Sequence, residues 1–491
     1  MMAERYLSSP EKRLTRGHRT AQTTMKTTLA LLPLLALPIT ATAAPPPKPN
    51  VVIILADDLG HADVGFAGGK EILTPNIDRL AASGARLAQF YVQPLCSPTR
   101  AALLTGRYPM RYGLQVGVIR PWEDRGLPLA ERTLPSALKE AGYQTAIVGK
   151  WHLGHNQAAY LPTHRGFDHQ YGHYCGAIDY FTHDRDGGFD WHRDDRACRD
   201  EGYSTHLVAR EATRLIRERE RGKSLFLYVP FNAVHGPHQV PEVYKKPYAS
   251  LKEPRQTYAG MVAAMDEAIG QILDALASER IQNDTLVFFS SDNGGPSPGR
   301  VTDNGPLRAG KGTLYEGGAR VCACVAWPGK IKPGIIIDQP LHIVDWFPTL
   351  LRLAGAPLDQ ALAVDGHDIW PVLTASAPSP HAEILINAKP TSGAIRAGDW
   401  KLVLNGGAVS DEEDGVHTKR AKRGKKTKNQ ESVELFNLAE DVGEKSNRAA
   451  EFPDRVTDLR ARYDALAAQA APPANRPKAP DFKSPAVWGE R

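Results

Sequence analysis

Short apolar runs, each followed by polar residues, recur along this chain and limit what it can fold into. Residues 51–55 form a continuous apolar run that suits a strand buried on both faces. Comparable runs lie at 145–148, 225–229 and 286–289. Helical patterns separate the runs and span 76–87, 98–105, 134–141, 204–219 and 258–276. Because strands that alternate with helices are typical of α/β domains, we predict a large, mostly parallel sheet flanked by helices.

Polar side chains follow each of the four runs at the point where the strand should end. Open α/β sheets collect ligands at the carboxyl ends of their strands. We therefore expect these side chains to share one crevice, although they are distant in sequence. They are Asp57, Asp58, Lys150, His152, His235, Asp292 and Asn293.

Four of these residues predict a metal site. Asp57, Asp58, Asp292 and Asn293 offer only hard oxygen ligands, which suit Ca²⁺ or Mg²⁺ rather than zinc. Aspartate is also common in turns, so one pair of strand-end aspartates would be weak support. Two pairs after separate strands favour a cation, with Ca²⁺ as the prediction and Mg²⁺ as the alternative.

The segment Cys96-Ser97-Pro98-Thr99-Arg100 opens a predicted helix. Pro98 suits the first turn of that helix, and Gly106 is placed to end it. Cys96 would then lie at a helix N-terminus, where free N–H groups favour an anion, and Arg100 would add donors. We expect this position to activate a thiol, although a thiol alone explains neither Pro98 nor Arg100. The alternative is a buried structural cysteine beside a helix start.

Cys-x-Pro-x-Arg at 96–100, followed by Leu-Thr-Gly-Arg at 104–107, resembles the signature of type I sulfatases. In that family the cysteine, here Cys96, is oxidised to formylglycine, whose hydrated aldehyde is the nucleophile. The resemblance covers nearly all of residues 50–450. It implies an alkaline-phosphatase-like fold, a maturation enzyme that makes formylglycine, and a cation shell that position 96 helps to complete.

The resemblance also implies roles for basic residues. The segment 149–154 is similar to the second sulfatase signature and carries Lys150 and His152. Lys311 matches the lysine that contacts sulfate, and His235 matches the histidine of the leaving group. Each of them alone is more often a solvated loop residue.

The implied reaction uses these groups in sequence. The cation, Arg100, Lys150 and Lys311 neutralise the sulfate while a hydroxyl at position 96 attacks sulfur. His235 protonates the departing alcohol. His152 then takes a proton from the second hydroxyl, sulfate is expelled and the aldehyde is restored.

Within the family, the chain is similar to the arylsulfatase B, or N-acetylgalactosamine-4-sulfatase, group. The supporting segments are 93–96, 111–115, 161–168 and 258–262. The chain departs from that group in a basic insertion, in most cysteine positions and in loops 170–200. We predict a sulfatase of sulfated glycans or aryl sulfates. A phosphoester or phosphonate hydrolase of the same superfamily and an inactive glycan-binding homologue are the alternatives.

The N-terminal residues predict export. Residues 1–44 are interpreted as a leader, in which 25–44 have the basic start, apolar centre and small-residue cleavage site of a signal peptide. We expect a secreted or periplasmic protein. No later segment is apolar enough to span a membrane, and no nucleic-acid partner is expected.

A change in composition near residue 375 predicts a second part of the chain. Residues 45–375 would form the catalytic domain, and 376–491 a smaller subdomain with an antiparallel sheet and one packed helix at 454–471. The basic insertion 411–429 is either a solvated hairpin tip or a patch that holds sulfated polysaccharide. The Pro-rich tail from Pro472 is expected to be poorly ordered.

Five cysteines follow the leader, and an odd number in an exported protein indicates one special thiol, for which Cys96 is the candidate. Cys175 and Cys198 flank a loop and are the candidates for a disulfide. Cys322 and Cys324 lie in an apolar, strand-like run and are interpreted as core residues, because a disulfide between strand neighbours is strained.

Overall fold

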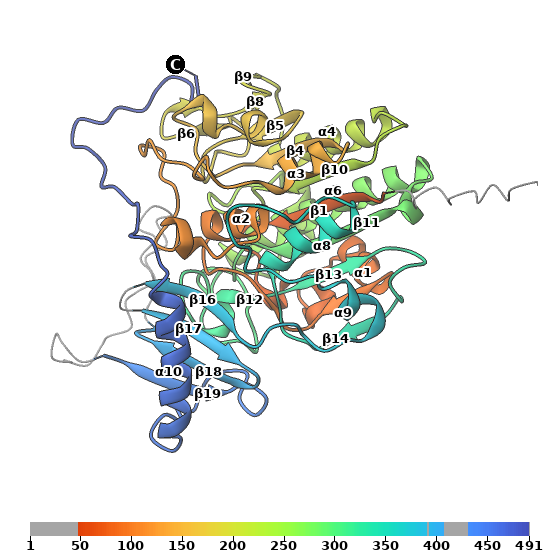
Figure 1. Ribbon diagram of the computed structural model, residues 1–491. Coiled ribbons are helices and arrows are strands. Elements are labelled where there is room, and N and C mark those ends of the chain that lie inside the picture. The colour runs from red at the N-terminus through yellow and green to blue at the C-terminus, as the bar shows by residue number, and fades with distance from the viewer. Residues whose placement is uncertain (1–47, 390–391, 407–430, 491) are drawn as a thin grey trace, which may run out of the picture. The chain divides into compact units, whose positions relative to one another are not determined.

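A computed structural model describes residues 48–389, 392–406 and 431–490 (Figure 1). Its main feature is a ten-stranded sheet, with strand order β14-β2-β13-β11-β1-β10-β4-β5-β8-β9. The strands, in that order, are Ile335–Ile337, Ala85–Leu87, Ala323–Ala326, Thr285–Ser291, Asn50–Ala56, Leu225–Pro230, Gln144–Lys150, His169–His173, His192–Arg193 and Arg196–Ala197.

The centre of this sheet is parallel, as predicted. Strands β11, β1, β10, β4 and β5 pair in parallel, whereas β13 next to β11 and β8 next to β5 pair antiparallel. The four predicted apolar runs are β1, β4, β10 and β11, each confirmed with small extensions at its ends. Their carboxyl ends therefore meet at one edge of the sheet.

Helices cover both faces of the sheet. Successive side chains of its buried strands point to opposite faces, so each strand contributes to two hydrophobic cores. Residues 51, 53 and 55 of β1 pack into one core with α2 (Cys96–Thr105), α3 (Leu134–Glu140) and α8 (Trp346–Leu353). Residues 52, 54 and 56 pack into a second core with α1 (Pro75–Ala82), α4 (Ser204–Glu218) and α6 (Arg255–Ser278). The predicted α/β architecture is confirmed.

Two stretches differ from the expectation. The helix expected at 76–87 ends at Ala82, and residues 85–87 form β2 instead. Gly84 permits this turn, since a Cβ there would lie 2.1 Å from the Val325 carbonyl oxygen. The stretch 153–203, in which no strand was predicted, contributes β5, β8 and β9 to the main sheet.

The smaller antiparallel sheet and its helix are confirmed. Strands β16, β17, β18 and β19 pair in that order, and α10 packs on them through buried Leu459 and Tyr463. Their bounds are Ile384–Lys389, Ser392–Ala397, Trp400–Leu404 and Val433–Asn437, with α10 at Pro453–Ala467. The leader 1–44 and the insertion 411–429 lie outside the described residues, and the domain boundary near 375 stays a prediction.

The remaining elements are short. They are β3 (Phe90–Tyr91), β12 (Arg320–Val321) and β15 (Leu341–His342) in a three-stranded sheet, the hairpin β6 (Asp184–Arg185) and β7 (Gly188–Phe189), and helices α5 (Glu242–Lys245), α7 (Glu316–Ala319) and α9 (Trp370–Ala375). Within the described ranges, no helix combines the length and the apolarity needed to cross a bilayer. No disulfide joins any of the five cysteines, all of which are described, so Cys175 and Cys198 are not bonded to each other.

The C-terminal tail is ordered by contacts, so the expectation of a poorly ordered tail is wrong. After α10 it runs to the region of β6 and β8 (Figure 1). Ala474 N–H donates to the Gly113 carbonyl oxygen at 3.1 Å, and Arg476 N–H donates to Glu123 at 2.7 Å. Trp488 is 1% exposed, and its ring nitrogen donates to the Arg185 carbonyl oxygen at 2.8 Å. We call residues 472–490 the C-terminal strap.

Candidate active site

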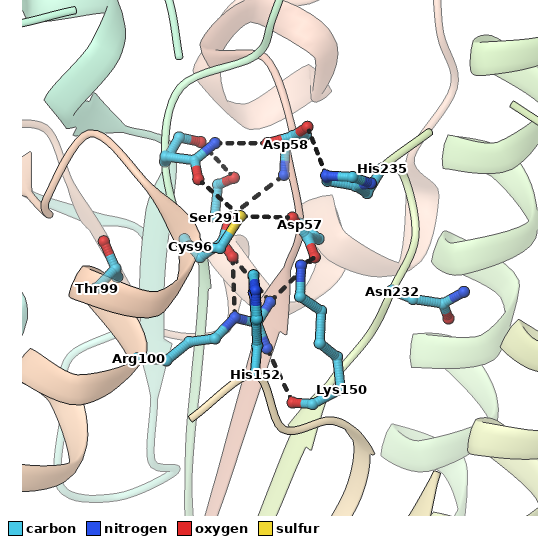
Figure 2. Close-up of polar contacts among 12 residues, drawn as sticks. Asp57, Asp58, Cys96, Thr99, Arg100, Lys150, His152, Asn232, His235 and Ser291 are labelled. Atoms are coloured by element: carbon cyan, nitrogen blue, oxygen red, sulfur yellow. Dashed lines mark hydrogen bonds and ion pairs between the residues drawn. The ribbon is translucent and has the colours of Figure 1, made fainter. Parts of the chain in front are cut away.

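The polar residues at the ends of four parallel strands form a single buried cluster (Figure 2). Asp57 and Asp58 follow β1, Lys150 ends β4, His235 comes after β10, and Asp292 follows β11. Asp58 adopts a positive φ of 63°, a conformation that aspartate tolerates better than most residues. The predicted convergence at the carboxyl edge is thus observed.

Cys96 enters this cluster from the N-terminus of α2. The helix begins at Cys96, two residues earlier than expected, and ends as predicted at Gly106, which has a φ of 68°. The Cys96 Sγ lies 3.4 Å from both Asp57 Oδ1 and Asn293 Oδ1, and the residue is 1% exposed. The hydroxyl of Thr99 donates to the Gln93 carbonyl oxygen at 2.9 Å, which fixes the loop that leads into the helix.

Arg100 and Lys150 form ion pairs with the carboxylates of Asp57 and Asp292 next to Cys96. Arg100 Nε and Nη2 donate to Asp292 Oδ2 at 3.1 and 2.8 Å, and Nη2 also donates to Asp57 Oδ2 at 3.2 Å. Lys150 Nζ donates to the same Asp57 oxygen. All four side chains are fully buried, and such charges persist inside a protein only when they are paired like this.

Lys311 and His235 lie together next to Asp58. Lys311 Nζ is 3.0 Å from Asp58 Oδ2 and 3.2 Å from His235 Nε2. His235 Nδ1 is 2.6 Å from the Gly236 carbonyl oxygen, which can only accept, so Nδ1 carries a proton. His235 Nε2 is therefore the ring nitrogen that can gain and lose a proton, and Figure 2 shows this ring beside Asp58.

His152 joins the cluster through the start of α2. The Ser97 hydroxyl donates to the His152 carbonyl oxygen at 2.9 Å and accepts the Ile119 N–H at 3.1 Å. His152 Nε2 is 3.1 Å from the Ile119 carbonyl oxygen, so this nitrogen donates and Nδ1 is the basic one in the neutral ring. A Cβ at Gly176 would lie 2.6 Å from the His152 ring, so only glycine leaves the ring this position.

The charges in the cluster shift one another's protonation. Burial alone would raise the pKa of Asp57, but Lys150, His235 and Arg100 lower it below the usual range. Burial, followed by the charge of Asp57, raises the pKa of Asp292 to about 6.

The thiol of Cys96 is not activated, contrary to the expectation from the helix N-terminus. Burial is the largest cause, and the carboxylates of Asp292 and Asp57 add to it, so the pKa of Cys96 lies well above its ordinary value. Burial, together with these carboxylates, outweighs the attraction of the helix N-terminus for an anion. The thiol is therefore neutral and a poor nucleophile.

The donor atoms of the cluster fit a hard divalent cation. Asp57, Asp58, Cys96 and His235 each place one potential ligand atom within 4.8 Å of the others. Asn293 turns its carbonyl oxygen toward Cys96 and donates from Nδ2 to Asp58 Oδ1 at 2.7 Å. The carboxylates of Asp57 and Asp58 and the amide oxygen of Asn293 are donors that Ca²⁺ and Mg²⁺ prefer, whereas the predicted ligand Asp292 does not belong to this group of atoms and bonds to Arg100.

The loop that carries Lys311 is anchored by a buried ion cluster that the sequence analysis missed. Lys401 Nζ in β18 lies 2.9 Å from Glu316 Oε1 and 2.9 Å from Glu444 Oε1, and all three side chains are buried. The Glu316 N–H also donates to Glu444 Oε2 at 2.6 Å. A lysine in the otherwise apolar run 400–404 was the available signal, because buried lysines are almost always paired.

Replacing Lys401 with methionine should destabilise the fold by about 3–5 kcal/mol, because two buried glutamates would lose their shared partner. Urea unfolding measures this change. The matched control is Arg79→Ala, which breaks the exposed pair between Arg79 and Asp274 at 3.0 Å and should cost under about 1 kcal/mol. Equal costs for the two substitutions would contradict a structural role for the buried cluster.

Comparison with known proteins agrees with this geometry. The family model described as Sulfatase matches residues 49–356, a range that contains all the predicted catalytic and metal residues. Arylsulfatase J of Mus musculus is 36% identical over 486 residues, covering 90% of this chain and 80% of that protein. N-acetylgalactosamine-6-sulfatase of Homo sapiens is 37% identical over 357 residues, covering 68% of this chain and 67% of that protein.

A solved structure shares the architecture. Ps i-CgsB, crystallised in complex with k-i-k-neocarrahexaose, superposes with a TM-score of 0.77 at 32% identity, over 87% of this chain and 94% of that one. The large mixed sheet between helices, with the small antiparallel sheet beside it, is the predicted alkaline-phosphatase-like fold.

Proposed function

This chain belongs to the sulfatase family and is a sulfuric ester hydrolase, and from this premise we propose that it removes sulfate from sulfated glycans or aryl sulfates. The named relatives include an arylsulfatase and an N-acetylgalactosamine-6-sulfatase, and Ps i-CgsB was solved with a neocarrahexaose. These names support a sulfated sugar as substrate. The narrower N-acetylgalactosamine 4-sulfate specificity, which came from the resemblance to arylsulfatase B, stays a prediction.

The place of Cys96 carries the proposal. Its Sγ lies 3.4 Å from oxygens of Asp57 and Asn293, at the first residue of α2. Formylglycine made from Cys96 would supply, as its hydrate, the hydroxyl that attacks sulfur. Ca²⁺ held by Asp57, Asp58, Asp292, Asn293 and position 96 would polarise the sulfate and favour ionisation of that hydroxyl.

The basic residues of the cluster would bind the sulfate and transfer the protons. Arg100 and Lys150 keep Asp57 and Asp292 ionised and oriented, and they add positive charge beneath the sulfate. Lys311, at the less buried side of the cluster, would bind a sulfate oxygen. His235 Nε2 would protonate the departing alcohol. His152 Nδ1 would then accept a proton from the second hydroxyl, so that the carbon–oxygen bond to sulfate breaks, sulfate leaves and the aldehyde is restored.

Export and maturation complete the proposal. The signal peptide at 25–44 would direct the chain to the periplasm or outside the cell, and a formylglycine-generating enzyme would convert Cys96. The support for export is the sequence of the leader.

Mass spectrometry of the peptide that contains Cys96 tests the proposal most directly. After expression with a formylglycine-generating enzyme, we expect the peptide to have lost its sulfur and the protein to cleave p-nitrophenyl sulfate faster than p-nitrophenyl phosphate. Faster cleavage of the phosphate would favour the phosphoester hydrolase instead. An active enzyme whose Cys96 is an unmodified thiol would exclude the formylglycine route.

The substrate is found with a panel of sulfated oligosaccharides. Carrageenan, chondroitin sulfate, dermatan sulfate and ulvan fragments, assayed by release of inorganic sulfate, cover the main sugar types. Desulfated fragments serve as blanks in the same assay.

A further inference from the structure

A large aromatic ring is exposed on the loop between β5 and β6. Phe181 is 45% exposed. Its ring packs against Tyr203 at 5.3 Å between centroids, with an angle of 40° between the ring planes. The ring is thus supported from one side by Tyr203, while nearly half of the residue stays open to solvent and can contact a ligand.

The loop holds the Phe181 ring in a defined place. Asp179 Oδ1 accepts the N–H groups of Phe181 and Thr182 at 2.9 and 2.8 Å, which closes a tight turn around the residue. The backbone of Tyr180 is bonded on both sides, through its N–H to Gln239 Oε1 and through its carbonyl oxygen to the Ser204 N–H, each at 2.9 Å. A ring fixed before a ligand arrives loses little freedom on binding.

This loop is joined directly to the loop of the proposed proton donor. The Tyr180 hydroxyl lies 2.6 Å from the Asn232 carbonyl oxygen and 2.8 Å from the His235 carbonyl oxygen. Asp179 Oδ2 also accepts from Gln239 Nε2 at 2.7 Å. Phe181 is the next residue after Tyr180, so its position is tied to the side of the site from which the alcohol would depart.

We propose that Phe181 is a stacking platform for a sugar ring of the substrate, on the leaving-group side of the active site. The inference rests on the proposed function. Sugar rings present C–H faces that pack on aromatic rings, while their hydroxyl groups stay in water. The ligand class is thus the saccharide part of a sulfated oligosaccharide, whereas the sulfate itself binds in the charged cluster.

Substitution of Phe181 tests the platform on the oligosaccharide that the panel shows to be cleaved fastest. Phe181→Ala should raise KM about tenfold, a change of about 1.4 kcal/mol, with kcat within twofold and the inhibition constant of inorganic sulfate unchanged. Phe181→Tyr keeps an aromatic face and should retain the original KM. The control is Ile336→Ala in β14 at the far edge of the sheet, 59% exposed, which should change none of these values.

The outcomes separate the platform from the activity. An unchanged KM in Phe181→Ala would overturn the platform, and so would a joint change of kcat, KM and sulfate inhibition, since that pattern marks a distorted loop. A wild-type enzyme that cleaves p-nitrophenyl sulfate but no oligosaccharide would overturn the platform and leave sulfatase activity intact. Loss of both activities in the matured wild type would instead refute the proposed function.

Discussion

Cys96→Ala should reduce sulfate ester hydrolysis by about 10³-fold or more, because the substitution removes the side chain from which the nucleophile is made. The fold should persist, since a small side chain replaces another small side chain in a buried place. Hydrolysis of p-nitrophenyl sulfate, measured beside circular dichroism of the same samples, checks both expectations.

The matched control for this substitution is Cys324→Ala. Cys324 is as deeply buried as Cys96 but lies in β13, opposite Phe289 of β11 and away from the carboxylates. We expect normal turnover and a loss of about 1–2 kcal/mol of stability from the missing core atom. Substantial residual activity in Cys96→Ala would show that position 96 does not supply the nucleophile.

Asp292→Asn should have the second largest effect, a loss of about 10²-fold or more in kcat/KM. The amide keeps the shape of the carboxylate but removes the charge that faces Arg100 at 2.8 Å and that would bind the cation. A higher Ca²⁺ concentration should therefore be needed for half-maximal activity. Titration of the chelator-treated enzyme with Ca²⁺ measures this shift.

Asp63→Asn is the control for the loss of a buried carboxylate. Asp63 is 1% exposed and pairs with Arg255 at 2.7 Å, outside the cluster around Cys96. Its replacement should lower stability while the Ca²⁺ requirement stays as in the wild type. If Asp292→Asn also keeps the wild-type Ca²⁺ requirement, Asp292 is not a ligand of the cation.

The central strands of the large sheet were predicted well from the sequence, because strands that are buried on both faces need apolar side chains throughout. The runs that became β1, β4, β10 and β11 are apolar throughout, so no other environment suits them. The strands β5, β8 and β9, at one end of the sheet, escaped prediction because they are short and carry histidine, arginine and glutamine. Their pairing depends on neighbours in space, which local composition does not reveal.

The candidate site was partly predictable, because the carboxyl ends of parallel strands lie at the same edge of a sheet. That rule predicts from the sequence that Asp57, Lys150, His235 and Asp292 lie together. It did not reveal which groups pair. The bonds from Arg100 to Asp292 and from Lys401 to Glu316 join residues far apart in sequence, and packing alone brings them together.

The C-terminal strap shows a limit of a different kind. The prolines and charged residues of 472–490 predicted a poorly ordered tail. Trp488, however, is buried against the backbone of the β6–β7 hairpin. A segment that is held by one large side chain shows neither the helical nor the strand pattern of apolar residues, so its sequence does not predict the contact.

Trp488 contacts the β6–β7 hairpin through a hydrogen bond to Arg185, which lies 303 residues earlier in the sequence. Contacts between residues so distant in sequence form slowly, because bringing them together orders a long stretch of intervening chain. The contacts that bury Trp488 against this hairpin therefore depend on prior folding of the large sheet between the two segments.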